Sequence, residues 1–124
     1  MISLIRFEIE GEPIPQSRPR VTRNGNVYTP KRCADYRKLV ALCASVAMQE
    51  KSMFQKDVPI VATIDFYRKR KATSRADIDN LLKSILDSCN GIVFEDDAQV
   101  VEIHCRKLQS DNPHVEIEFR RKRK

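Results

Sequence analysis

Four segments of the chain alternate apolar and polar residues with a period of two, at about residues 5–9, 58–67, 101–106 and 115–119. Successive side chains of a β-strand point to opposite faces, so each segment is predicted to be a strand with one buried and one polar face. Strands of this kind require a second layer that covers the apolar face of their sheet. In the third strand the predicted inward side chains are Val101, Ile103 and Cys105.

Two helical segments supply that layer. The first is predicted from about residue 30 to 50, with Thr29 as its N-cap and Pro30 as its first helical residue. The second begins near Asp79 and ends at Asn90-Gly91. The predicted apolar stripes are Tyr36, Leu39, Val40, Cys43, Val46 and Ala47 on the first helix, and Leu81, Leu82, Ile85, Leu86 and Cys89 on the second.

The resulting order β-α-β-α-β-β predicts an α+β fold, in which two helices pack on one face of a mixed β-sheet. Before the first helix, Asn24-Gly25 predicts a tight turn with a short strand at residues 27–28 beyond it. A length of 124 residues supports one compact domain, which we expect to span residues 1–124. The other sheet face is polar and is available to solvent, a partner subunit or DNA.

Apolar runs and cysteines limit the cellular setting. No run approaches the roughly 18 apolar residues of a membrane span, and the first residues become polar too early for a secretory signal. The four cysteines (33, 43, 89 and 105) form no Cys-x-x-Cys pair, which favours reduced thiols over disulfides or a zinc site. We therefore expect a cytoplasmic protein without a membrane partner.

Charge is strongly segregated along the chain, which has 23 Lys and Arg against 17 Asp and Glu. Residues 16–38 carry a net charge of +6 and residues 68–76 carry +5, whereas seven carboxylates and one lysine give residues 77–105 a charge of −6. Basic surfaces indicate a polyanionic partner such as nucleic acid. Carboxylates repel phosphate unless cations lie between them, so an acidic segment in a basic chain is typical of a metal-dependent enzyme acting on phosphodiesters.

The acidic segment contains two motifs, Asp-Ile-Asp-Asn-Leu-Leu-Lys at 77–83 and Glu-Asp-Asp at 95–97. Asp77 and Asp79 point to the same side if their backbone is extended, and Lys83 lies one helical turn after Asp79. If the chain folds Asp96 and Asp97 back beside them, hard oxygen ligands converge in a site that suits Mg²⁺ or Mn²⁺. The metal would then activate water, and Lys83 would offset charge on the phosphate.

The basic segments would hold the flanking phosphates of a nucleic acid, which gives affinity without sequence information. The candidate DNA-binding residues are Arg18, Arg20, Arg68, Lys69, Arg70, Lys71 and Arg75.

Each acidic feature also has a purely structural interpretation. Asp79 would be an N-cap, Asp77 a turn residue, the pair at 96–97 an exposed turn, and Lys83 a solvated side chain. Two functional hypotheses therefore stand at this point. One is a metal-dependent nuclease, and the other is a non-catalytic basic module that binds nucleic acid.

Five elements, in this order, resemble the RusA family of Holliday junction resolvases. They are Pro-Ile-Pro-Gln-Ser-Arg-Pro-Arg at 13–20, Tyr-Thr-Pro at 28–30, the motif at 77–83, Leu-Asp-Ser-Cys-Asn-Gly at 86–91, and Asp-Asp-Ala-Gln-Val at 96–100. The two acidic motifs are the more specific part of this resemblance, which covers nearly the whole chain. One departure lies at 16–18, where Gln-Ser-Arg stands in place of a Lys-Gly-Arg-like sequence, so one cation of the loop is missing.

The resemblance implies a homodimeric, Mg²⁺-dependent endonuclease that cuts four-way DNA junctions by paired symmetric nicks in recombination and repair. It implies that Asp77, Asp79 and Asp97 are the metal-binding and catalytic carboxylates, with Lys83 as the catalytic cation and Asp96 less critical. Proteins of this kind are often carried by phages and prophages. A metal nuclease acting on other branched DNA remains an alternative.

Overall fold

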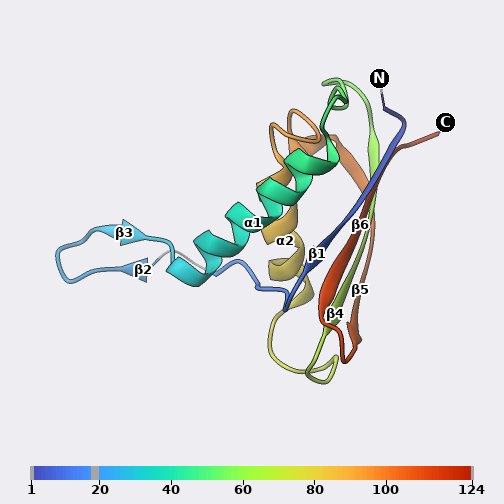
Figure 1. Ribbon diagram of the computed structural model, residues 1–124. Coiled ribbons are helices and arrows are strands. Elements are labelled where there is room, and N and C mark those ends of the chain that lie inside the picture. The colour runs from blue at the N-terminus through green and yellow to red at the C-terminus, as the bar shows by residue number, and fades with distance from the viewer. Residues whose placement is uncertain (1, 18–19, 124) are drawn as a thin grey trace.

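A four-stranded sheet with two helices on one face forms the body of the molecule (Figure 1). This is a computed structural model, which describes residues 2–17 and 20–123. The sheet comprises β1 (Leu4–Glu10), β4 (Ile60–Arg68), β5 (Val100–Gln109) and β6 (His114–Arg121), and the helices are α1 (Lys31–Ala47) and α2 (Ile78–Cys89). A short hairpin, β2 (Arg20–Val21) and β3 (Val27–Tyr28), and a 3₁₀ turn, η1 (Asp97–Gln99), complete the described elements.

The strand order is β1-β6-β4-β5. β4 pairs in parallel with β5 and antiparallel with β6, which also pairs antiparallel with β1, so the sheet is mixed. Helix α2 connects the parallel strands β4 and β5, as a crossover between parallel neighbours requires. The predicted α+β architecture is therefore confirmed, and β5 forms one outer edge of the sheet.

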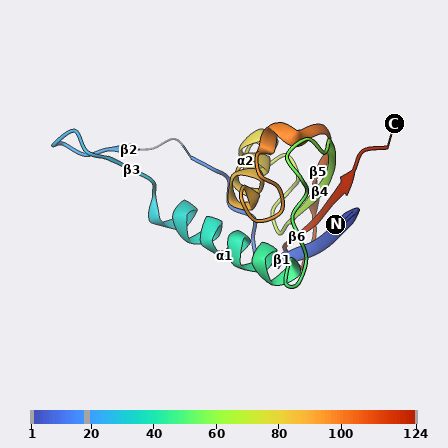
Figure 2. The ribbon, with the colours of Figure 1, turned by 90° about the horizontal axis from the view of Figure 1, so that it is seen from above.

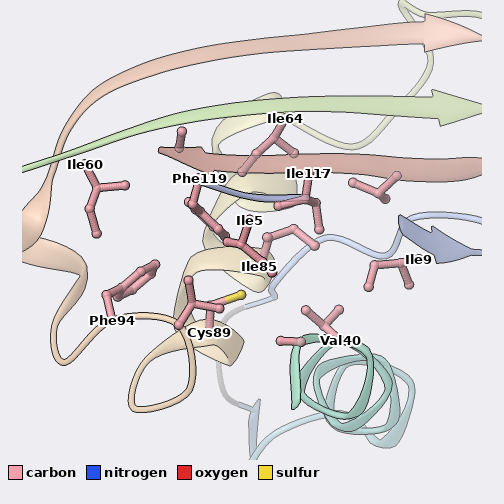
Figure 3. Packing of buried hydrophobic residues seen from close by; sticks show 14 of the residues in the cluster. Ile5, Ile9, Val40, Ile60, Ile64, Ile85, Cys89, Phe94, Ile117 and Phe119 are labelled. Carbon is pink, nitrogen blue, oxygen red and sulfur yellow. The ribbon is translucent and has the colours of Figure 1, made fainter. Parts of the chain in front are cut away.

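The core lies between the sheet and the two helices (Figure 3). Ile64 in the central strand is fully buried, and Phe94 meets Phe119 edge to face with ring centroids 5.3 Å apart. Val40 of α1 and Ile85 of α2 are also fully buried against this layer. The two helices are thus fixed by apolar burial, which is the main stabilising contribution in a domain of this size.

Helix α1 differs from its prediction in its bounds and in its buried stripe. The N-cap is Pro30, with no side-chain capping bond, and the helix ends at Ala47. Leu39 and Val46, predicted to face inward, are 39% and 57% exposed. The helix packs mainly against α2 and β1, so a narrow stripe is enough to cover its contact. The residues that it buries are Cys33, Tyr36, Val40 and Ala44.

The predicted inward face of β5 is also wrong in part. The register between β4 and β5 shifts at a bulge, so that Ile60 lies opposite Val100 whereas Val61 lies opposite Glu102. The extra residue, Val101, is 56% exposed. Ile103 lies opposite the buried Ala62 but is 42% exposed, because β5 is an edge strand.

The β2–β3 hairpin extends away from the body (Figure 2). Its turn contains Gly25 with φ of +81°, a conformation that favours glycine, so the turn predicted at Asn24-Gly25 is confirmed. Val21 and Val27 are 66% and 68% exposed at the paired positions of the hairpin.

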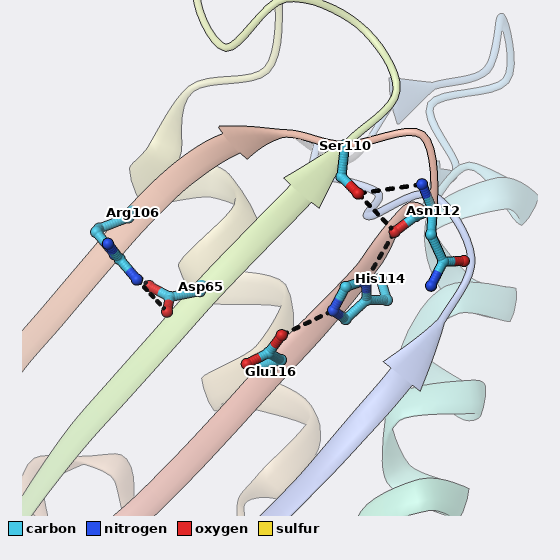
Figure 4. A network of polar contacts seen from close by, with 6 residues as sticks. All are labelled: Asp65, Arg106, Ser110, Asn112, His114 and Glu116. Carbon is cyan, nitrogen blue, oxygen red and sulfur yellow. Dashed lines mark hydrogen bonds and ion pairs between the residues drawn. The ribbon is translucent and has the colours of Figure 1, made fainter.

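Carboxylates are concentrated on the open face of the sheet. Asp65 receives two hydrogen bonds from Arg106, of 2.8 and 2.9 Å, and Glu116 lies 2.8 Å from the ring of His114 (Figure 4). Arg6 donates to Glu118 at 2.8 Å. Most of the cations on this face are therefore engaged by acids, so it is a poor surface for DNA. None of the described helices is long and apolar enough to span a membrane.

Candidate active site

The start of α2 presents two exposed carboxylates. Asp77 occupies the N-cap position with extended backbone, but its side chain makes no capping hydrogen bond. Among the described residues, the Asp79 carboxylate accepts a hydrogen bond from the backbone amide of its neighbour Asn80, at 3.0 Å. The interpretation of Asp79 as the N-cap is therefore wrong, and both side chains remain open to a ligand.

The backbone before this helix is unusual. Ala76 has a backbone φ of +126°, which residues other than glycine rarely adopt. Its carbonyl accepts a hydrogen bond from the Lys107 side chain at 3.0 Å. Such conformations cost free energy and are concentrated at functional sites. Asp77 and Asp79 line an open hollow with Arg106 and Lys107 of β5. Lys83 is exposed one turn after Asp79, on the same helix face.

In the second acidic motif, Asp96 and Asp97 make different contacts. The Asp96 carboxylate accepts the Ala98 amide at 3.1 Å, and the Gln99 side chain accepts the amides of Glu95 and Asp96, so Asp96 and Gln99 form a capping box around η1. Gln99 also donates to two backbone carbonyls before β4. Asp97 takes no part in the capping box, so it is the aspartate of this pair that can serve a ligand.

The groups that shift the pKa of Asp97 show that it lies at the C-terminal end of α2. Burial raises the pKa of Asp97, and the neighbouring carboxylates of Asp96 and Asp87 raise it further, while a hydrogen bond with Asn90 opposes them. The Ala98 amide is the main cause that lowers the pKa of Asp96. Because Asp87 and Asn90 belong to the C-terminal end of α2, Asp97 lies beside that end and not beside Asp79.

The separation between Asp79 and Asp97 can be estimated from the lengths of two elements, α2 and β5. From Asp79 to Asn90 the helix rises by about 16 Å at 1.5 Å per residue. From Val100, just after Asp97, to Lys107, which contacts Ala76, strand β5 spans about 23 Å at 3.3 Å per residue. Figure 1 shows the loop before α2 and the turn after it at opposite ends of the helix.

The single chain therefore does not bring the predicted metal ligands together. Within residues 2–17 and 20–123 no three His, Cys, Asp or Glu side chains lie close enough to hold a metal ion. Asp77 and Asp79 form one half of the predicted set, and Asp97 is isolated from them as the other half. A metal centre that needs all three does not fit one chain.

Basic residues lie close to Asp77 and Asp79. Lys69, Arg70 and Arg75 line a hollow that adjoins Ala76 and is completed by Arg32 from the first turn of α1. Sequence reasoning missed Arg32 as a site residue, although the basic excess over residues 16–38 pointed to its neighbourhood. Lys71 is exposed in the same loop, whereas Arg20 is exposed on the hairpin and Arg18 lies outside the described residues.

Arg68 requires a correction. It is only 5% exposed, its guanidinium lies 3.5 Å from the Glu12 carboxylate, and it donates to the backbone and side chain of Ser74. A buried arginine with these partners holds the 69–75 loop in place, so it is not available to contact DNA.

The proline-rich segment lies against both helix starts. The Gln16 amide donates to the Asn80 carbonyl at 2.9 Å, and the Cys33 thiol contacts the Pro15 carbonyl and the Ser17 hydroxyl at 3.4 Å. These bonds hold residues 15–17 beside the acidic motif of α2. The proline-rich loop at 13–20, the basic segment at 68–76 and the motif at 77–83 are therefore neighbours in space, as far as their described residues show.

Comparison with known proteins agrees with these motifs. Residues 10–120 match the model of the endodeoxyribonuclease RusA family. The chain is 32% identical to an uncharacterised protein, YqaN, of Bacillus subtilis strain 168, over 94% of this chain and 95% of that protein. It is 31% identical to a crossover junction endodeoxyribonuclease, rusA, of Lactococcus phage r1t, over 56% of this chain and 60% of the phage protein.

Proposed function

The chain belongs to the RusA family of endodeoxyribonucleases, and on this basis we propose that it resolves four-way DNA junctions by paired symmetric nicks. Nucleases of this family depend on a metal ion, and we propose Mg²⁺, with Mn²⁺ as a substitute. The proposed setting is recombination and repair of bacterial or phage DNA in the cytoplasm. The proposed active form is a homodimer, because two sites related by a two-fold axis match the symmetry of the junction.

The observation that carries this proposal is the exposed acidic start of α2 within a basic surround. Asp77 and Asp79 are free of capping bonds, and the adjoining hollow is lined by Arg32, Lys69 and Arg70. Cations beside a carboxylate pair attract phosphate, and so would let a nucleic-acid backbone approach the two carboxylates. The open sheet face, with its excess of engaged carboxylates, leaves the helix side as the surface for DNA.

The residues of this chain have distinct proposed roles. Phosphates on either side of the scissile bond are held by the exposed cations Arg20, Lys69, Arg70, Lys71 and Arg75. Arg18, which lies outside the described residues, has the same proposed role. Lys83, which is solvated and one turn from Asp79, offsets the charge that develops on the reacting phosphate. Asp77, Asp79 and Asp97 are the proposed metal-binding and catalytic carboxylates.

A cleavage assay tests the proposal. The wild-type chain is expected to nick a synthetic four-way junction in Mg²⁺ and to leave it intact in EDTA. Replicate reactions on fork, flap and linear duplex DNA separate junction resolution from activity on other branched DNA. Equal cutting of all four substrates would contradict the proposed specificity.

Asp79→Asn separates catalysis from binding. This variant is expected to lose cutting while junction binding, measured by mobility shift in Ca²⁺, survives, since the cations that bind phosphate are unchanged. The matched control is Glu10→Gln, which neutralises an exposed carboxylate on the open sheet face and is expected to cut like the wild type. Full cutting by Asp79→Asn would contradict the proposed catalytic role of Asp79.

A further inference from the structure

The end of the sheet where the chain terminates carries a second cationic surface, which the candidate active site does not include. Five consecutive cations occupy residues 120–124, and the structure describes the first four of them. A hollow at this end, which we call the C-terminal hollow, is lined by Ser3, Leu4, Arg120, Arg121 and Arg123. These described residues include three arginines and no carboxylate, so the C-terminal hollow is strongly positive.

Backbone hydrogen bonds fix the position of this hollow. The Arg121 amide, at the end of β6, donates to the Ser3 carbonyl at 2.9 Å, and the Lys122 amide donates to the Pro59 carbonyl at 2.8 Å. These bonds hold the two termini together at one end of the sheet, where Figure 1 places the labels N and C. As far as Lys122, the basic segment is therefore part of the folded surface.

The carboxylates that accompany this end of β6 on the open sheet face are paired with other cations. Glu118, two residues before Arg120, accepts a hydrogen bond from Arg6 at 2.8 Å. Glu102 forms an ion pair with Lys122, and the hydrogen bond from Lys122 is the main cause that lowers the pKa of Glu102 to about 2. Since both acids are engaged, neither is available to neutralise Arg120.

The C-terminal hollow and the basic loop at 69–75 lie at opposite ends of the sheet. Arg121 pairs with Ile60 at the start of β4, whereas His114 pairs with Tyr67 near the end of β4. Strand β6, from His114 to Arg121, spans about 23 Å at 3.3 Å per residue. Successive base pairs of duplex DNA are about 3.4 Å apart, so this spacing corresponds to about seven base pairs.

We propose that the C-terminal hollow is a second DNA-binding site, which holds the phosphate backbone of a junction arm about seven base pairs from the phosphates held at 69–75. Arginine suits this ligand because its planar guanidinium can donate two parallel hydrogen bonds to one phosphate. The inference rests on the proposed function in taking junction DNA as the ligand. Such contacts position an arm and carry no sequence information.

Arg120→Gln combined with Arg123→Gln tests the site. Junction binding is measured by mobility shift in Ca²⁺ at several salt concentrations, with arms of about 20 base pairs. Loss of two phosphate contacts is expected to reduce the slope of log K against log salt by about 1.8, at about 0.9 for each contact. The matched control, Arg120→Lys combined with Arg123→Lys, keeps both charges and is expected to keep the wild-type slope.

Arm length locates the contact. On a junction with G·C-rich arms of about seven base pairs, the backbone ends before it reaches the C-terminal hollow, because the phosphates held at 69–75 already lie outside the branch point. The wild type and the glutamine variant are therefore expected to bind this short junction with the same slope. The difference between them is expected only on the longer arms.

These measurements have outcomes that decide the proposal. A reduced slope for the glutamine variant on long arms alone, together with a wild-type slope for the lysine variant, supports the site. A wild-type slope for the glutamine variant overturns it, and so does an equal reduction on short and long arms. If the melting temperature shows that the double variant does not fold, Arg123→Gln alone is used, and the expected reduction is about 0.9.

Failure of this inference can be distinguished from failure of the proposed function. Binding in Ca²⁺ requires no cleavage, so a wild type that binds junctions but never nicks them in Mg²⁺ contradicts the nuclease proposal and leaves the slope measurement intact. A wild type that nicks junctions, with a glutamine variant that keeps the full slope, contradicts the C-terminal site alone.

Discussion

At the scale of single residues, the neighbouring aspartates at 96 and 97 have different physical roles. The Asp96 carboxylate is used by a backbone amide, whereas the Asp97 carboxylate is half-buried and is held beside other acids, which raises its pKa. The folded structure therefore disfavours the ionised form of Asp97 and favours the ionised form of Asp96. A group whose ionised form is disfavoured by its own fold is a candidate for an external cation.

Asp96→Ala and Asp97→Asn are expected to separate these roles. Asp96→Ala removes a capping bond and lowers the melting temperature while cutting continues. Asp97→Asn keeps the melting temperature, because a neutral side chain relieves the repulsion from Asp87 and Asp96, but it lowers the nicking rate by more than about a hundredfold. Thermal unfolding and single-turnover nicking measure the two effects. The reverse pattern would contradict the division.

His114 makes stability depend on pH. Burial alone would lower its pKa, but hydrogen bonds with the Asn112 carbonyl and the Glu116 carboxylate outweigh burial and raise it (Figure 4). The folded state therefore holds the proton more tightly than the unfolded state. This contribution is full below the ordinary histidine pKa of 6.5 and is lost as pH rises through the higher folded value.

His114→Gln is expected to remove this dependence. The stability difference between wild type and variant, measured by urea unfolding, should be largest near pH 5.5 and should shrink by about pH 8.5. The stacking of His114 on Tyr67 is absent from the variant at every pH and sets a constant offset. A difference that grows with pH would contradict the assignment.

At the scale of elements, the interior could be predicted and the edges could not. The period-two alternation identified all four sheet strands, and the helical spacing located α2, because both patterns report burial against the core. The exposure of Val101 could not be predicted, since one inserted residue at a bulge changes which face every neighbour occupies. The exposure of Leu39 could not be predicted either, because it depends on how narrow the contact of α1 is.

Ile103→Lys tests whether the proposed homodimer forms across the edge of β5, whose outer side pairs with none of the described strands. Ile103 is 42% exposed in the single chain, so a lysine there should fold normally while its charge opposes association across the edge. We expect a shift from dimer to monomer in light scattering, with an unchanged circular dichroism spectrum. Leu42→Lys, at a 62% exposed position on α1, is the control and should remain dimeric. The opposite result would move the interface to α1.

At the scale of the whole molecule, charge divides the protein into two sides. The sequence showed that basic and acidic segments alternate. Only the fold shows that the engaged carboxylates gather on the open sheet face, while Arg32, Lys69 and Arg70 line a hollow next to Ala76, just before α2. The sequence also supplied the identity of the three catalytic candidates. It could not supply their separation, because that depends on which end of α2 the chain returns to.

The salt dependence of junction binding tests this division. Lys69→Gln with Arg70→Gln should weaken binding and reduce the slope of log K against log salt by about 0.9 for each phosphate that the protein no longer neutralises. Arg6→Gln removes one cation from the open sheet face, where it is paired with Glu118, and should leave the slope unchanged. An equal weakening in both variants would mean that DNA binds to both sides.

The length of α2 sets how far apart the two acidic parts of the candidate site lie within one chain. They occupy opposite ends of the helix, so their spacing follows the twelve residues of α2, about 18 Å. One additional helical turn would move them about 5.4 Å further apart. The number of residues in this helix therefore decides how long a stretch of DNA backbone would have to be to contact both ends at once.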